Sequence, residues 1–116
     1  MLLKLDEPKL LSEIVGIISE LVTEVRLKVD KEGMSMVAID PANVALVSFS
    51  LPAKAFSQFQ LEKETLGVSL ENFKAVLKRC TPTSSLLIKR EDNFLQIEIH
   101  DKIKSVFTLA LIDIES

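Results

Sequence analysis

Three basic side chains lie close together in the sequence, and the chemistry that suits them is contact with phosphate. Lys74 and Lys78 are four residues apart, so they share one face of the helix predicted from Leu70 to Cys80. Arg79 follows directly. Cations in this arrangement can contact the phosphates of nucleic acid. The same spacing is typical of an ordinary solvated helix face, so the residues alone leave both interpretations open.

Cys80 and His100 are the other residues with reactive side chains, but neither has a partner. A single cysteine cannot form an internal disulfide, and a single histidine without a second Cys or His does not make a zinc site. We expect Cys80 to be a small apolar residue at the end of the second helix. The sequence also contains no Gly-rich phosphate loop and no nucleophile motif. It therefore predicts no catalytic residue, no metal, no cofactor and no enzymatic activity.

The composition predicts one soluble domain. The chain has 116 residues, of which 47% are hydrophobic and 27% charged, and this suits a single core. No apolar run approaches the roughly 18 residues that cross a bilayer. The first residues include Lys4, Asp6 and Glu7 and do not resemble a secretory signal, so we expect an intracellular protein.

The net charge restricts how the chain can bind nucleic acid. It is -3 at pH 7, which excludes a protein that coats nucleic acid by bulk electrostatics. Any contact with DNA must come from a local patch. The aromatic residues are six Phe without Trp or Tyr, which does not favour stacking on single-stranded bases.

The pattern of apolar residues predicts a strand, a helix and three strands, followed by the same order again. Apolar residues follow the 3.6-residue period over Lys9–Val22. Asp6 or Glu7 is expected to cap this helix, with Pro8 in its first turn. Ser69 is expected to cap the second helix. Helices on one face of largely antiparallel sheets make this an α+β fold of two βαβββ units.

Alternation of apolar and polar residues marks the strands. Gly33 lies where the turn after Asp30 needs a positive φ angle. Ala53–Leu61 has Phe56 and Phe59 at helical spacing, which predicts a short helical turn. The expected strands are Leu2–Leu5, Val25–Val29, Met34–Ala38, Val44–Leu51, Thr65–Ser69, Ser85–Arg90, Phe94–His100 and Ile103–Leu111.

Four segments together resemble one protein family. They are Gly33–Val47 (GMSMVAIDPANVALV), Leu66–Arg79 (LGVSLENFKAVLKR), Asn93–Ile97 (NFLQI) and Leu111–Glu115 (LIDIE), in this order. Over essentially its whole length the chain resembles the amino-terminal domain of the proliferating cell nuclear antigen family of sliding clamps, archaeal members more than eukaryotic ones. The resemblance implies the DNA-clamp fold. It also implies that residues 1–116 form a single clamp domain, truncated before the segment that connects it to a second, similar domain.

The resemblance also implies a function. A clamp of this family is a processivity factor, usually a trimeric ring, that encircles duplex DNA without sequence specificity. It tethers DNA polymerase, the clamp loader and other replication or repair proteins through their short peptide motifs. A protein-interaction domain from a checkpoint-type clamp relative would show the same pattern and remains an alternative.

The family's DNA-facing helix positions correspond here to Lys9, Lys74, Lys78 and Arg79. The first helix also carries Glu13 and Glu20, so we expect it to contribute less to DNA contact than the second helix.

Two protein contacts are implied by the same resemblance. Ile39, Asn43, Val44 and Leu46 match part of the pocket that receives partner peptides, although ordinary strand residues show the same alternation. Segments absent from this chain complete that pocket in the family, so we expect weak or no peptide binding.

The strand Ile103–Leu111 matches the sheet edge that pairs with a neighbouring subunit. Phe107, Leu109 and Cys80 are the expected interface residues. Without a second domain, we expect the chain to be monomeric or to self-associate through this edge.

Overall fold

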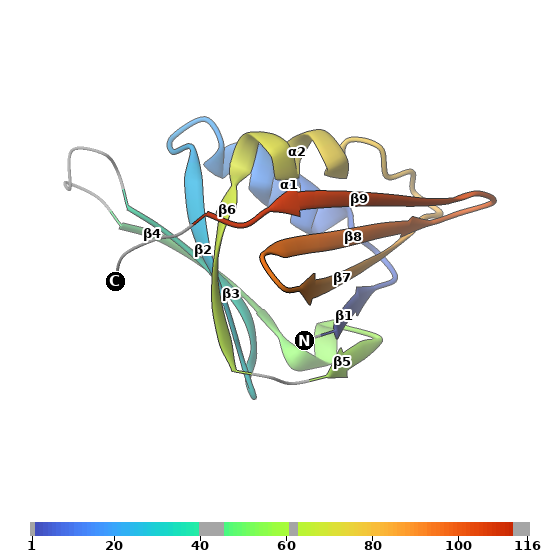
Figure 1. The fold of residues 1–116 in the computed structure, drawn as a ribbon, viewed down its shortest axis with the longest axis horizontal. Helices are drawn as coiled ribbons and strands as arrows, with labels where there is room; N and C mark the ends of the chain where they lie inside the picture. The colour runs from blue at the N-terminus through green and yellow to red at the C-terminus, as the bar shows by residue number, and fades with distance from the viewer. Residues whose placement is uncertain (1, 40–45, 61–62, 113–116) are drawn as a thin grey trace.

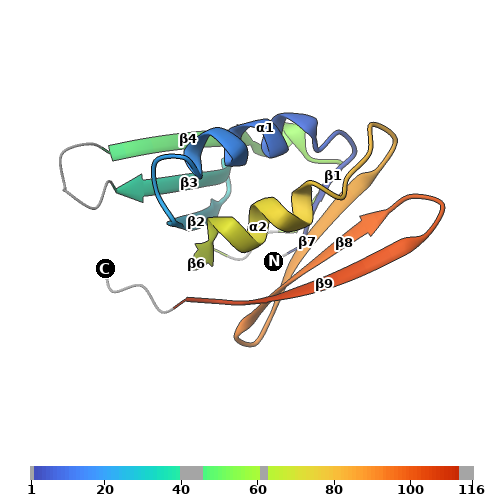
Figure 2. The same cartoon turned by 90° about the horizontal axis from the view of Figure 1, so that it is seen from above.

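Two antiparallel sheets and two helices that lie side by side make up the fold (Figures 1 and 2). A computed structural model describes residues 2–39, 46–60 and 63–112, although not the side chains of residues 39, 46 and 47. In chain order the elements are β1 (Leu2–Leu5), α1 (Lys9–Ile18), β2 (Glu24–Asp30), β3 (Gly33–Ile39), β4 (Leu46–Pro52), the 3-10 turn η1 (Ala53–Ala55), β5 (Gln58–Gln60), β6 (Glu64–Ser69), α2 (Leu70–Leu77), β7 (Ser85–Glu91), β8 (Phe94–His100) and β9 (Lys104–Ala110). The predicted α+β fold of two βαβββ units is confirmed, with η1 and β5 inserted between the units.

The two units exchange their first strands. β1 pairs with β7 of the second unit, which gives a five-stranded sheet in the order β5-β1-β7-β8-β9. β6 pairs with β2 of the first unit, which gives a four-stranded sheet in the order β4-β3-β2-β6. Because each sheet contains strands of both units, neither unit can fold around a core of its own.

The core lies between the inner faces of the sheets and the helices. Alternate residues of the strands are buried, as the period of two requires. From α2 the core receives Leu70, Phe73, Val76 and Leu77, whose spacing places them on one face of the helix. Ser69 caps this helix, since its Oγ accepts a hydrogen bond from the amide of Asn72 at 3.4 Å.

The turn between β2 and β3 depends on Gly33. Asp30 and Gly33 are register partners, and the carboxylate of Asp30 accepts a hydrogen bond from the amide of Glu32 at 2.8 Å. The φ angle of Gly33 is 146°, and a Cβ atom there would lie 2.1 Å from the carbonyl oxygen of Leu51. The predicted positive φ is therefore confirmed, and both the conformation and the close approach of β4 require glycine.

The first helix differs from its prediction at both ends. Pro8 is at the N-cap position without a side-chain cap, so the expected capping by Asp6 or Glu7 is wrong. Asp6 instead accepts a hydrogen bond from the hydroxyl of Ser57 at 3.2 Å, because the end of β1 lies beside the start of β5. The helix ends at Ile18 rather than Val22, and its last turn continues only as isolated turn hydrogen bonds.

Two further predicted boundaries are corrected. Only Ala53–Ala55 of the predicted helical segment is helical, and Gln58–Gln60 forms β5 on the edge of the larger sheet. Phe56 and Phe59 still pack together, with ring centroids 5.4 Å apart, which a turn followed by a strand achieves as well as a helix. The second helix ends at Leu77, three residues before Cys80.

Candidate nucleic-acid interface and subunit edge

The second helix positions the two lysines predicted to contact phosphate. Lys78 is the C-cap residue, and its amide donates to the carbonyl of Lys74 at 3.0 Å. The backbone therefore keeps the helical spacing between these two residues although the helix ends before Lys78. Lys78 is exposed and Lys74 half-buried. The pair can present two positive charges one helical turn apart.

Arg79 follows Lys78, but its guanidinium contacts an aromatic ring instead of projecting freely. Its guanidinium carbon lies 5.3 Å from the centroid of the Phe107 ring on β9, while the side chain stays exposed. This distance is within the range of a cation–π contact. The structure thus joins a residue predicted to face DNA with a residue predicted to face a neighbouring subunit.

Lys9 lies at the start of α1, beside the end of α2. Its Nζ is 4.0 Å from a carboxylate oxygen of Glu13, and both side chains are largely exposed. A groove of about 360 Å³ separates the two helix ends here, and its lining includes Lys9, Leu77 and Cys80. Glu13 offsets much of the charge of Lys9, so α1 adds little positive potential to the helix surface.

Cys80 lines this groove and packs partly against the core. Burial raises the pKa of its thiol above the ordinary value of 9.0. Such a thiol stays protonated and behaves as a small apolar side chain. No group of His, Cys, Asp and Glu that could hold a metal ion is present in the described part of the chain.

The predicted peptide pocket is only partly within the described residues. Ile39 and Leu46 are register partners at the ends of β3 and β4. Asn43 and Val44 lie outside the described residues, so the four residues stay a prediction as a group.

The predicted subunit edge is a sheet edge. β9 is the last strand of the five-stranded sheet and, among the described residues, pairs with β8 alone. Phe107 and Leu109 are half-buried and pack against the core, while Val106 on the other face is 50% exposed. An edge strand of this length, with unpaired backbone groups, is a surface on which another strand can pair.

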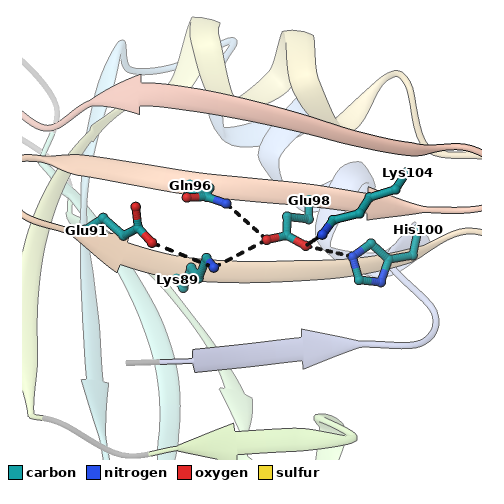
Figure 3. A network of polar contacts seen from close by, with 6 residues as sticks. All are labelled: Lys89, Glu91, Gln96, Glu98, His100 and Lys104. Carbon is teal, nitrogen blue, oxygen red and sulfur yellow. Dashed lines mark hydrogen bonds and ion pairs between the residues drawn. The ribbon is translucent and has the colours of Figure 1, made fainter.

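The outward face of the same sheet carries a polar network that the sequence does not predict (Figure 3). Glu98 is 4% exposed although it points away from the core residues that flank it on β8. Its carboxylate lies 2.8 Å from Nε2 of His100, 3.2 Å from Nζ of Lys104 and 3.5 Å from Nζ of Lys89, and it accepts a hydrogen bond from Gln96 at 3.0 Å.

These contacts favour the ionised form of Glu98. The hydrogen bond with His100 contributes most and, with Lys104 and Lys89, outweighs desolvation and lowers the pKa of Glu98 to about 2. The network joins β7, β8 and the start of β9. Strand register brings these residues together. The spacing of charged residues along each single strand does not predict the network.

The first helix also carries exposed apolar residues that its periodicity assigns to the buried face. Leu10, Ile17 and Leu21 are 53%, 64% and 61% exposed, respectively. The core side of the helix is formed instead by Leu11, Val15 and Ile18. No described helix is long and apolar enough to span a membrane.

Comparison with known proteins gives a consistent result. The family model for the proliferating cell nuclear antigen, N-terminal domain, matches residues 1–116. The DNA polymerase sliding clamp of Thermococcus fumicolans is 38% identical over 112 residues, which are 95% of this chain and 45% of the relative. That of Pyrococcus abyssi is 38% identical over 106 residues, or 90% of this chain and 43% of the relative.

Solved structures agree with the sequence matches. A chain of the PCNA2–PCNA3 complex from Sulfolobus tokodaii superposes with a TM-score of 0.94 at 28% identity, covering 100% of this chain and 48% of that one. PCNA from Thermococcus kodakaraensis gives a TM-score of 0.92 at 27% identity, with 99% and 48% covered. The chain thus spans about half the length of the relatives it matches. It belongs to the family defined by the amino-terminal domain of proliferating cell nuclear antigen.

Proposed function

We propose that this chain is one domain of a DNA polymerase sliding clamp, a non-enzymatic ring subunit that encircles duplex DNA inside the cell and tethers replication and repair proteins. The observation that carries the proposal is the arrangement of the two helices. α1 and α2 lie side by side (Figures 1 and 2), and α2 carries Lys74 in its second half and Lys78 at its C-cap. The named relatives and the fold match support this assignment.

The chemistry of the helix surface suits sliding rather than tight binding. Lysine ammonium groups contact phosphate oxygens without reading bases, so the protein can move along the duplex. Arg79 stacks on Phe107 and Lys9 pairs with Glu13, which leaves Lys74 and Lys78 as the main phosphate contacts in this proposal. Retention on DNA then comes from the closed ring, which keeps tethered partners at high effective concentration.

The ring requires other clamp subunits at the β9 edge, and the peptide pocket requires Ile39, Asn43, Val44 and Leu46. β9 has a free side in the described structure, which supports the first requirement. The relatives are about twice as long, which supports a second domain in the parent subunit. A trimeric parent ring is part of the same proposal.

The salt dependence of duplex binding tests the proposal. A plot of log Kobs against log salt has a negative slope, and each lost phosphate contact reduces its magnitude by about 0.9. The double variant Lys74→Gln with Lys78→Gln should therefore reduce the magnitude by about 2. Fluorescence anisotropy with labelled duplexes of two unrelated sequences measures this slope. Lys28→Gln with Lys31→Gln is the matched control, since both lysines are exposed at the β2–β3 hairpin. Equal slopes for the two double variants, or different affinities for the two duplexes, would contradict the proposal.

A further inference from the structure

The loop that follows α2 is held by a carboxylate of the β8–β9 hairpin. The hydroxyl of Thr81 donates a hydrogen bond to Asp101 Oδ2 at 2.8 Å, and the hydroxyl of Ser84 donates to the same oxygen at 3.2 Å. The other oxygen, Oδ1, accepts the amide of Lys102 at 2.9 Å. These bonds join the loop to the hairpin, although Thr81 and Asp101 are 20 positions apart in the sequence (Figure 1).

The hydroxyl groups of this loop form a connected set. Because Thr81 and Ser84 each have one hydroxyl proton and give it to Asp101, their oxygens are acceptors in their other hydrogen bonds. Ser84 Oγ accepts the amide of Thr81 at 2.9 Å, and Thr81 Oγ1 accepts the hydroxyl of Thr83 at 3.1 Å. Ser84 is 1% exposed, so leaving its hydroxyl unpaired would be costly. We call Thr81, Thr83, Ser84 and Asp101 the hydroxyl–carboxylate cluster.

The cluster begins where the hydrogen bonds of α2 end. Beyond Leu77, the next three amides still donate to carbonyls of the helix, and the last of them is that of Cys80, at 3.1 Å. The following amide, that of Thr81, donates to Ser84 Oγ instead. Helix ends fray unless neighbouring groups hold them. The turn that carries Lys78 is held by the helix on one side and by the cluster on the other.

The charge of Asp101 is unfavourable where it lies. The hydrogen bond from Thr81 lowers the pKa of Asp101 below its ordinary value of 3.8, so the carboxylate is ionised at neutral pH. It lies just beyond the C-terminus of α2, where the helix dipole favours cations, and it contacts the residue three positions after Lys78. If its charge alone mattered, removing Asp101 would strengthen phosphate binding. If its hydrogen bonds matter, removing it should weaken that binding.

We propose that Asp101 is a positioning residue for phosphate contact. By accepting the hydroxyls of Thr81 and Ser84, it fixes the loop after α2 and keeps the turn of Lys78 formed, one helical turn from Lys74. This role rests on the proposed function, because it concerns the lysines assigned there to phosphate. It adds a residue outside both helices to those that determine how the helix surface meets a duplex.

Two variants separate the hydrogen bonds of Asp101 from its charge. Asp101→Ala and Asp101→Asn remove the same negative charge, but asparagine keeps an oxygen that can accept from Thr81 and Ser84. Asp101 is exposed, so both variants should fold, and circular dichroism checks this. Glu91→Ala is the matched control, because it removes an exposed carboxylate at the opposite end of β7 from the loop.

Amide hydrogen exchange followed by NMR measures the positioning directly. In Asp101→Ala the amides of Lys78 and Cys80 should exchange several-fold faster, while those of the central strand β2 keep their rates. Asp101→Asn should restore most of the protection, and Glu91→Ala should not change it. Wild-type exchange of Lys78 and Cys80 in Asp101→Ala would overturn the proposal, because the turn would then need no support from the hairpin.

Duplex binding measures the consequence for phosphate contact. Asp101→Ala should reduce the magnitude of the slope of log Kobs against log salt by about 0.9, as loss of the Lys78 contact does. In a Lys78→Gln background it should cause no further reduction, because Asp101 acts through Lys78. Asp101→Asn should recover the wild-type slope. An unchanged or steeper slope in Asp101→Ala, or a further reduction in the Lys78→Gln background, would overturn the proposal.

The two measurements distinguish this role from the proposed function. Faster exchange at Lys78 with a wild-type slope in Asp101→Ala would reject the role of Asp101 and leave the proposed function in place. A wild-type chain whose duplex binding does not depend on salt would reject the proposed function, and the role of Asp101 with it.

Discussion

The guanidinium of Arg79 lies over the ring of Phe107, 5.3 Å from its centroid, and so connects the end of α2 to the edge strand β9. The two residues are 28 positions apart in the sequence, and only the packing of α2 against β9 brings them together. The contact orients an aromatic side chain that is half-buried on the edge where another strand can pair. Arg79 therefore contributes to the shape of the edge as well as to the local charge.

This relationship predicts a measurable coupling. Arg79→Gln and Phe107→Leu should each destabilise the fold, and a double-mutant cycle should give a coupling of about 0.5–1 kcal/mol, as for an exposed cation–π contact. Urea unfolding followed by circular dichroism provides the four free energies. Lys78→Gln is the control. Lys78 is the neighbouring cation, and among the described residues the cation that lies over the Phe107 ring is Arg79. Equal coupling for Lys78 and Arg79 would show that the effect is general electrostatics and not the stacked contact.

The pKa of Glu98 predicts an acid-dependent loss of stability. Its folded pKa of about 2 lies below the ordinary value of 4.5, so the folded state favours the ionised form. The resulting stabilisation is complete above about pH 4.5 and is lost as the pH falls through about 2. Thermal unfolding between pH 6 and pH 2 should therefore show a decline in Tm that Glu98→Gln reduces.

Glu91→Gln is the matched control for this prediction. Glu91 contacts only Lys89 of the same network, at 3.7 Å, and is largely exposed, so its removal should leave the acid profile nearly unchanged. At neutral pH Glu98→Gln should also be the less stable of the two variants, because it leaves Lys89 and Lys104 without their shared carboxylate. Parallel profiles for Glu98→Gln and the wild type would contradict the assigned pKa.

Burial of Cys80 predicts slow reaction with thiol reagents. Its raised pKa reduces the thiolate fraction at neutral pH, and the thiolate is the reacting species. Alkylation by iodoacetamide, followed by mass spectrometry, should be several-fold slower in the folded chain than in urea. An alkylation rate equal to that of the unfolded chain would show that the Cys80 thiol is fully accessible to reagents through the groove.

Elements whose burial follows one local period are predictable from the sequence. α2 is an example, since its buried residues and its Ser69 cap are both local features. The strands of the second unit also lie close to their predicted ranges. The predicted Lys74–Lys78 spacing is kept because it depends only on helix geometry.

Features that depend on contacts between distant segments are not predictable in this way. Leu10 and Ile17 fit a helical period as well as their buried neighbours do, and only the placement of α1 on the sheet decides which face is covered. Pairing of β5 with β1 decides that Gln58–Gln60 is a strand. The Glu98 network and the Arg79–Phe107 contact likewise require the register and packing of β9.

The two glycines outside β6 predict opposite effects of the same substitution. Gly33→Ala should destabilise the fold by at least about 2 kcal/mol, because alanine at φ 146° is strained and its Cβ would meet the backbone of Leu51. Gly16→Ala should stabilise it by about 0.5–1 kcal/mol, because a Cβ there has nothing within 4 Å and alanine favours the helix interior. Urea unfolding of both variants measures the difference. A destabilised Gly16→Ala would show that the open side of α1 is already covered in solution, and a neutral Gly33→Ala would show that the β2–β3 turn does not need its positive φ.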